Sequence, residues 1–160
     1  TSLGDSLSAF FSQIFKSRKK IIYAFLGMTA VGIPLYLFNP SDSPWVFYAI
    51  CGFLGLAGGY WAIFVTIASE QFGTNLRATV TTTVPNFVRG FLPFLLIGFK
   101  FLRTEFSSSS TPFFASTGDT PNPNVILYSA LIIGCATLLI AIYAVGHMDE
   151  TYAKDLDYTE

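Results

Sequence analysis

The 160-residue chain is 52% apolar, 17% aromatic and only 12% charged. About a quarter of the residues of a soluble domain are charged, so this composition argues against a soluble enzyme. Nine Lys and Arg against ten Asp and Glu leave a net charge of −1 without a basic stripe, which argues against nucleic-acid binding.

Long uncharged stretches divide the chain into segments that could cross a membrane. Runs of 21, 27 and 29 residues without a formal charge follow Lys20, Asp42 and Asp119, and a fourth apolar stretch holds only two bases. A helix needs about 20 apolar residues to cross the hydrocarbon, and lipid-exposed backbone must satisfy its own hydrogen bonds. Residues 1–148 are therefore predicted to form a partial span and four full spans, at about 1–16, 21–38, 45–69, 76–103 and 124–147.

The bases are distributed unevenly between the two predicted membrane faces. Two of them, Lys100 and Arg103, lie on one face, and six lie on the other: Lys16, Arg18, Lys19, Lys20, Arg77 and Lys154. Because Lys and Arg accumulate on the cytoplasmic side, we expect the polar tail 149–160 in the cytoplasm and the Ser/Thr/Pro-rich loop 104–123 outside. This predicts a multi-pass protein of a plasma or inner membrane.

The chain opens inside an apolar segment at Thr1, without a basic leader or a cleavage site, so we expect a portion of a longer protein. No enzyme constellation accompanies the single His147, and no metal-ligand cluster or Gly-rich phosphate loop is present. Cys51 and Cys135 fall within spans, where small side chains pack well. We therefore expect no catalysis, no cofactor and no bound metal.

Two ionisable residues are predicted to lie deep in the membrane, where a charge is costly and a functional role is the default hypothesis. Asp5 precedes the basic loop by about ten residues, which at about 1.5 Å per residue is close to the midplane. A carboxylate that exchanges its proton is a candidate for proton coupling, and a structural contact to a neighbouring helix is the alternative. Arg89 keeps its proton, so it must pair with a carboxylate such as Asp5, face water or bind an anion.

Tyr60 and Trp61, in the middle of the third segment, are candidates for a solute-binding wall, although aromatic residues in spans more often serve packing. Four glycines lie just before these two aromatic residues, at three- and four-residue spacings: Gly52, Gly55, Gly58 and Gly59. Glycines at such spacings let neighbouring helices approach closely. Pro85 and Pro93 in the third full span, 76–103, permit bending, as does the Gly32–Pro34 interruption near the end of the first full span, 21–38.

The segment ASEQFGTNLRAT, at 68–79, resembles the cytoplasmic loop between the tenth and eleventh helices of major facilitator superfamily transporters, typically E-x-F-P-T-x-x-R-A. Gly73 stands where many members have Pro, and the matching residues are Glu70, Phe72, Thr74, Arg77 and Ala78. Two further segments are similar to family motifs: AFFSQIFKSRKK, at 9–20, resembles G-x-x-x-D-R-x-G-R-R, and the tail after 147 resembles E-T-x-G-x-x-L at Glu150, Thr151 and Leu156.

The resemblance implies an all-α membrane protein that forms a partial C-terminal six-helix bundle of a major facilitator fold, from the end of the eighth helix through the twelfth. It resembles sugar porters and metabolite symporters, and it implies a missing N-terminal bundle. Cavity-facing positions would then include Asp5, Tyr60, Trp61 and Arg89, and a cytoplasmic gate would form from Glu70, Arg77, Arg18, Lys19 and Lys20.

We therefore expect a fragment of a secondary transporter that moves a small solute by alternating access, coupled to protons through Asp5. Its partners would be the solute, protons and the lipid bilayer. The alternative is a small multi-span scaffold or assembly subunit without transport activity, whose glycine faces bind partner helices.

Overall fold

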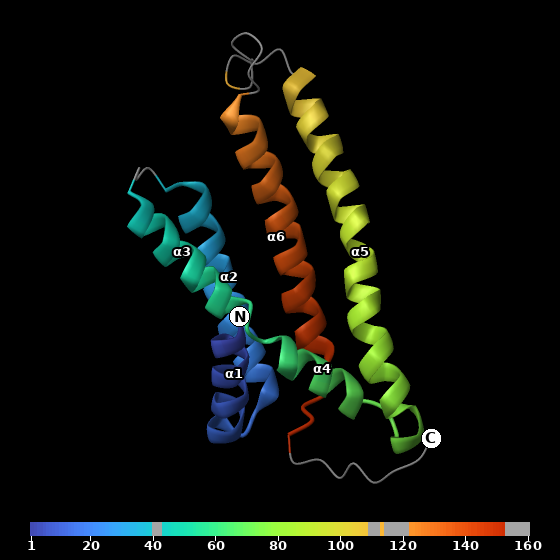
Figure 1. The fold of residues 1–160 in the computed structure, drawn as a ribbon. Helices are drawn as coiled ribbons and strands as arrows, with labels where there is room; N and C mark the ends of the chain where they lie inside the picture. The colour runs from blue at the N-terminus through green and yellow to red at the C-terminus, as the bar shows by residue number, and fades with distance from the viewer. Residues whose placement is uncertain (40–42, 109–112, 114–121, 153–160) are drawn as a thin grey trace.

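The computed structural model describes residues 1–39, 43–108, 113 and 122–152. These residues form helices and no strands, and the helices pack side by side as an elongated bundle (Figure 1). The helices are α1 (Ser2–Phe15), α2 (Arg18–Leu37), α3 (Pro44–Ala57), α4 (Trp61–Glu70), α5 (Thr74–Ser108) and α6 (Pro123–His147). Residues 153–160 of the predicted tail, Lys154 and Leu156 included, lie outside the described residues.

Four helical segments of the described residues are long and apolar enough to cross a membrane. They are α2 with 20 residues, Pro44–Glu70 with 27, α5 with 35 and α6 with 25, and about 20 residues suffice. Helix α1 has 14 residues, so it is too short to span by itself. The chain is therefore an all-α, multi-pass membrane protein, as the uncharged runs predicted.

The continuous helix predicted over 45–69 is wrong in one respect, because the structure divides it into α3 and α4. Helix α3 ends at Ala57 and α4 begins at Trp61, with Gly58 and Gly59 between them. The backbone N–H of Gly59 donates to the carbonyl of Leu56 at 2.9 Å, a tighter turn than an α-helix makes. Glycine lowers the helix preference at both positions.

The break lies where α1 meets the backbone of this segment. A Cβ atom on Gly59 would stand 2.3 Å from the Cα of Gly4, and one on Gly4 would stand 2.5 Å from the carbonyl oxygen of Leu56. Both distances are far below a van der Waals contact, so only glycine permits this approach. Of the predicted glycine faces, Gly59 makes such a contact, whereas a Cβ on Gly52 would have no neighbouring atom within 4 Å.

None of the three predicted helix-bending prolines interrupts its helix. Helix α2 continues through Pro34, and α5 continues through Pro85 and Pro93. Helix α5 also extends five residues beyond the predicted end at 103, so the start of the predicted 104–123 loop is helical. At about 1.5 Å per residue, α5 is about 52 Å long, which exceeds the hydrocarbon thickness of about 30 Å.

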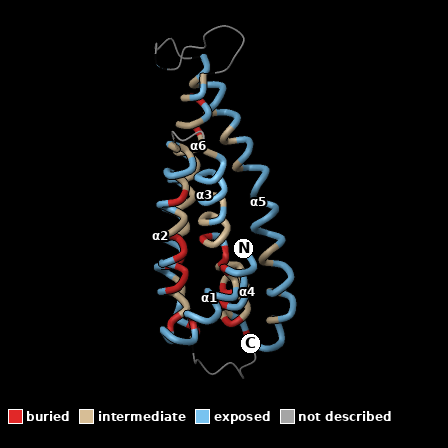
Figure 2. Tube along the Cα trace, turned by 60° about the vertical axis from the view of Figure 1, so that its left-hand side comes forward, coloured by how far each residue is buried: buried red, intermediate tan, exposed pale blue. Residues whose placement is uncertain are grey.

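The core lies between α2, α4 and α6, near one end of the bundle. Its buried apolar residues are Ile21, Ile22, Phe25, Leu26, Ile63, Ile67 and Val145. Figure 2 places buried positions on α1, α2 and α4, whereas α5 carries none and turns most of its length outward. At the core end, the start of α2, the end of α4, the start of α5 and the end of α6 come together (Figure 1).

Candidate functional site

A buried ion pair joins the start of α2 to the end of α4. The Arg18 guanidinium lies 2.5 Å from the Glu70 carboxylate, and their side chains are 17% and 8% exposed. Glu70 is the last residue of α4, where the helix dipole disfavours a negative charge. Arg18 supplies the positive charge that this buried carboxylate requires.

The carboxylate of Glu150, just beyond α6, binds the amino-terminal end of α2. It accepts hydrogen bonds from Ser17 Oγ at 2.6 Å and from the backbone N–H groups of Arg18 at 3.0 Å and Lys19 at 3.3 Å. The first N–H groups of a helix have no partner within it, and the helix dipole favours an anion there. Glu150 therefore caps α2 from a segment more than 130 positions away in the sequence.

These contacts change the acidity of Glu150. Partial burial opposes ionisation and raises the pKa of its carboxyl group, but the hydrogen bonds from Ser17 and from the backbone of Arg18, Tyr152 and Lys19 outweigh that effect. The net result is a pKa below the usual value of 4.5, because those donors stabilise the carboxylate. Glu150 is therefore ionised at neutral pH.

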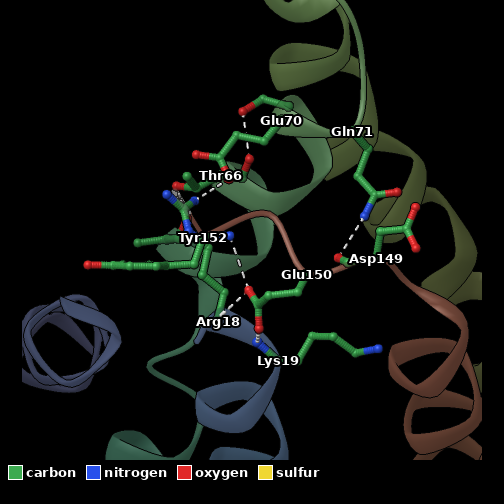
Figure 3. A network of polar contacts seen from close by, with 10 residues as sticks. Arg18, Lys19, Thr66, Glu70, Gln71, Asp149, Glu150 and Tyr152 are labelled. Atoms are coloured by element: carbon green, nitrogen blue, oxygen red, sulfur yellow. Dashed lines mark hydrogen bonds and ion pairs between the residues drawn. The ribbon is translucent and has the colours of Figure 1, made fainter. Parts of the chain in front are cut away.

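Lys19 makes the complementary contact at the end of α6. Its ammonium group donates to the carbonyl oxygens of Met148 at 2.6 Å and Gly146 at 3.2 Å. A cation at a helix C-terminus satisfies free carbonyl groups and interacts favourably with the dipole. Lys19 and Glu150 thus cap each other's helices, and with Arg18 and Glu70 they form what we term the basal cluster (Figure 3).

The tail after α6 is attached at further points. Gln71 Nε2 donates to the backbone carbonyl of Asp149 at 3.3 Å, and the Tyr152 hydroxyl donates to Gln13 at 3.5 Å. Thr151 is 2% exposed. Figure 3 shows this segment passing between α2 and α4, so the basal cluster connects three helices.

The structure brings some of the predicted gate residues together and leaves others at the edge. Arg18, Lys19 and Glu70 belong to the basal cluster, whereas Lys20 is exposed and donates its backbone N–H to Ser17 Oγ at 3.4 Å. Arg77 lies half-buried in the first turn of α5. The residue missing from the predicted gate is Glu150, and its signal was an acid directly after the last span on the same face as the basic loop.

A second group, the mid-span cluster, lies around the break between α3 and α4 and consists of Asp5, Tyr60, Trp61 and Arg89. The Asp5 carboxylate accepts the backbone N–H of Ala62, in the first turn of α4, at 3.4 Å. The Arg89 guanidinium lies over the Trp61 ring, 5.5 Å from its centroid. Tyr60 occupies the N-cap position of α4 and packs against the core.

The two charged members contact consecutive residues of α4. Asp5 bonds to Ala62 and Arg89 stacks on Trp61, and no ion pair joins the two among the described residues. Asp5 comes from α1 and Arg89 from α5, and both of these helices pack against α4. The three helices therefore converge on one break.

Other candidate features remain outside both clusters. An open hollow on α5 is lined by Thr82, Thr83, Asn86 and neighbouring Phe side chains, and it does not include Arg89. The cysteines Cys51 and Cys135 are free. Within the described part of the chain, no group of three His, Cys, Asp or Glu residues could hold a metal ion.

Comparison with known proteins found no matching family model, no matching curated protein and no matching solved structure.

Proposed function

We propose that this chain is the C-terminal part of a secondary transporter of the major facilitator type, which moves a small solute by alternating access and is coupled to protons. The observation that carries the proposal is the ion pair of Arg18 with Glu70. These two residues belong to two separate segments that resemble the family's loop motifs, and they meet at one end of a multi-pass helical bundle. If either segment resembled its motif only by chance, there would be no reason to expect Arg18 and Glu70 to meet.

The basal cluster would act as a gate on the cytoplasmic face of a plasma or inner membrane. Its contacts stabilise the arrangement in which the ends of α2, α4 and α6 lie together. A transporter alternates between two arrangements, and contacts made in only one of them shift the equilibrium toward it. The tail beyond α6 would then be cytoplasmic, in agreement with the uneven distribution of bases.

The mid-span cluster would hold the coupled ion and the solute. A helix broken near the middle of a span supplies free backbone groups to a binding site, as broken helices in transporters do. Here the break between α3 and α4 is contacted by a carboxylate, Asp5, and faced by a guanidinium, Arg89. Asp5 is the proposed site of proton exchange.

A disulfide between positions 18 and 70 tests the gate. In the complete gene product containing this chain, with Cys51 and Cys135 replaced by Ala, we introduce Arg18→Cys and Glu70→Cys and reconstitute the protein into proteoliposomes. Oxidation should abolish solute uptake driven by a pH gradient, and reduction should restore it, because the disulfide prevents the ends of α2 and α4 from separating. A second pair, Tyr36→Cys with Phe47→Cys, reports non-specific effects of oxidation, because these two rings lie 6.1 Å apart at the other end of the bundle.

Uptake that is equally fast with the 18–70 disulfide formed would contradict the gate. Absence of uptake of every solute in a screen, with the protein folded, would favour the scaffold alternative. That alternative has one structural observation in its favour, because the helix face at Gly52 is open to a partner helix.

A further inference from the structure

Arg89 lies too far along α5 to reach the membrane surface easily. It follows Thr74 by fifteen residues and precedes Ser108 by nineteen, so it is about 22 Å from the start of the helix. Its neighbour Trp61 likewise lies within the 27-residue span Pro44–Glu70. Arg89 therefore places a positively charged guanidinium within a helix long enough to span the membrane.

The contacts of Arg89 do not balance that charge. The Trp61 ring attracts the cation, but a cation–π contact is weak compared with the cost of placing Arg at the centre of a membrane helix. The ring also offers no lone pair to the five N–H donors of the guanidinium. An anionic acceptor would supply both the negative charge and the lone pairs that the Trp61 ring lacks.

The carboxylates of the two clusters have other partners. Asp5 accepts the N–H of Ala62, Glu70 pairs with Arg18, and Glu150 caps α2. No carboxylate of the described residues forms an ion pair with Arg89. Arg89 is also exposed, so its donors are accessible from the bundle surface.

We propose that Arg89 binds the carboxylate of a small organic monocarboxylate, with Trp61 and Phe64 contacting its apolar body. The planar guanidinium matches a carboxylate with two parallel hydrogen bonds, and the Trp61 and Phe64 rings, 5.4 Å apart, offer an apolar surface beside it. This inference rests on the proposed transport function, because it names the class of solute that the mid-span cluster would carry.

The charge balance of the mid-span cluster favours a ligand with one carboxylate over a ligand with two. Asp5 contacts the residue next to Trp61, so its negative charge is close to the bound anion. The one guanidinium of the cluster balances one negative charge of the ligand. A monocarboxylate therefore fits better than a dicarboxylate, whose second charge meets no further cation in the mid-span cluster.

The test measures binding to the complete gene product in lipid nanodiscs by isothermal titration calorimetry, with benzoate, pyruvate, succinate and benzamide as probes. Benzamide has the shape of benzoate without its charge. We expect saturable binding of a monocarboxylate, at least tenfold weaker binding of succinate and no binding of benzamide. Arg89→Gln should weaken monocarboxylate binding at least tenfold, Arg89→Lys should retain part of it, and Arg103→Gln, at the far end of α5, should leave it unchanged.

Equal binding of benzoate and benzamide, absence of binding of either monocarboxylate, or unchanged binding in a folded Arg89→Gln variant would each overturn the proposal. Unchanged binding in the Arg89→Gln variant is the result expected if a carboxylate of another protein segment pairs with Arg89. Uptake measured separately in proteoliposomes distinguishes the two proposals. Monocarboxylate binding without uptake of any solute would overturn the transport proposal and support the anion site. Uptake of a neutral solute without monocarboxylate binding would support transport and overturn the anion site.

Discussion

Glu70 illustrates how one residue at a helix end depends on a distant partner. A carboxylate at the C-terminus of α4 meets the negative end of the helix dipole, and with 8% of its side chain exposed it has little water to solvate it. Arg18 makes this position acceptable. Removing either member of the pair takes away the opposite charge that stabilises the buried position of the other.

We therefore predict that Glu70→Gln lowers the free energy of unfolding by about 3 kcal/mol, since breaking a buried pair costs about that much. Replacing both partners, as Arg18→Met with Glu70→Leu, should recover most of the loss. Thermal unfolding in detergent measures both variants, with Glu105→Gln on an exposed part of α5 as the control. If the single and double variants are equally destabilised, the ion pair is not the cause.

The contacts of Glu150 lead to a prediction about how the stability of the protein depends on pH. Its pKa is below the value in the unfolded chain, so its contribution to stability is complete above pH 4.5 and is lost as pH falls through its folded-state pKa. Glu150→Gln should lower stability at pH 7 by about 0.5–1 kcal/mol, the range of a helix cap. As pH falls through the folded-state pKa of Glu150, the stabilities of the variant and the parent should converge.

Melting temperatures at several pH values between 3 and 7 check this prediction, with the neighbouring Asp149→Asn as a matched control. Only the Glu150 variant should lose part of the acid dependence. An identical pH profile for the parent and the Glu150→Gln variant would mean that the cap at α2 contributes nothing measurable.

At the scale of elements, the break between α3 and α4 depends on two glycines that face each other across helices. The Cα atoms of Gly4 and Gly59 approach so closely that no side chain fits between them. That contact brings Asp5 to the first turn of α4, where it accepts the N–H of Ala62. A packing detail thereby determines the position of a candidate coupling residue.

Gly59→Ala should destabilise the protein by about 2–3 kcal/mol, because a methyl group 2.3 Å from backbone atoms forces α1 away from the break. Gly52→Ala, at an open position, should cause no loss and a slight gain from helix preference. Thermal unfolding of the two variants gives the comparison. Equal stability of both would show that the close approach of α1 is dispensable.

At the scale of the whole molecule, the clusters divide the proposed work between two levels of the bundle. The basal cluster connects helix ends, and the mid-span cluster joins α1, α4 and α5 around the break. If transport follows the proposed mechanism, the first controls access and the second controls what is carried. The two levels can be tested independently, because they share no residue.

Asp5→Asn in the complete gene product should abolish accumulation of solute driven by a pH gradient while it preserves exchange of solute across the membrane. The amide keeps a hydrogen-bond acceptor for Ala62 but takes up no proton at physiological pH. Uptake and counterflow in proteoliposomes measure the two activities. Uphill transport at the normal rate in this variant would remove Asp5 from the coupling mechanism.

Much of the architecture could be predicted from local sequence, because a membrane imposes length and polarity on each segment. Three runs without charge and a fourth apolar stretch with two bases predicted four spanning segments. The residues around Lys20 and Glu70 predicted one boundary each of two of these segments. The depth predicted for Asp5 and Arg89 likewise comes from their distance along the chain to the nearest charged loop. These properties depend on one helix at a time.

Contacts between helices were decided by the tertiary structure. Nothing local to Gly59 indicates that it meets Gly4, and nothing local to Glu150 indicates that it caps α2. The stacking of Arg89 on Trp61 likewise depends on how α4 and α5 pack. The physical reason is that hydropathy specifies which residues enter the membrane, whereas the fit of backbones and the pairing of charges between helices specify which of them meet.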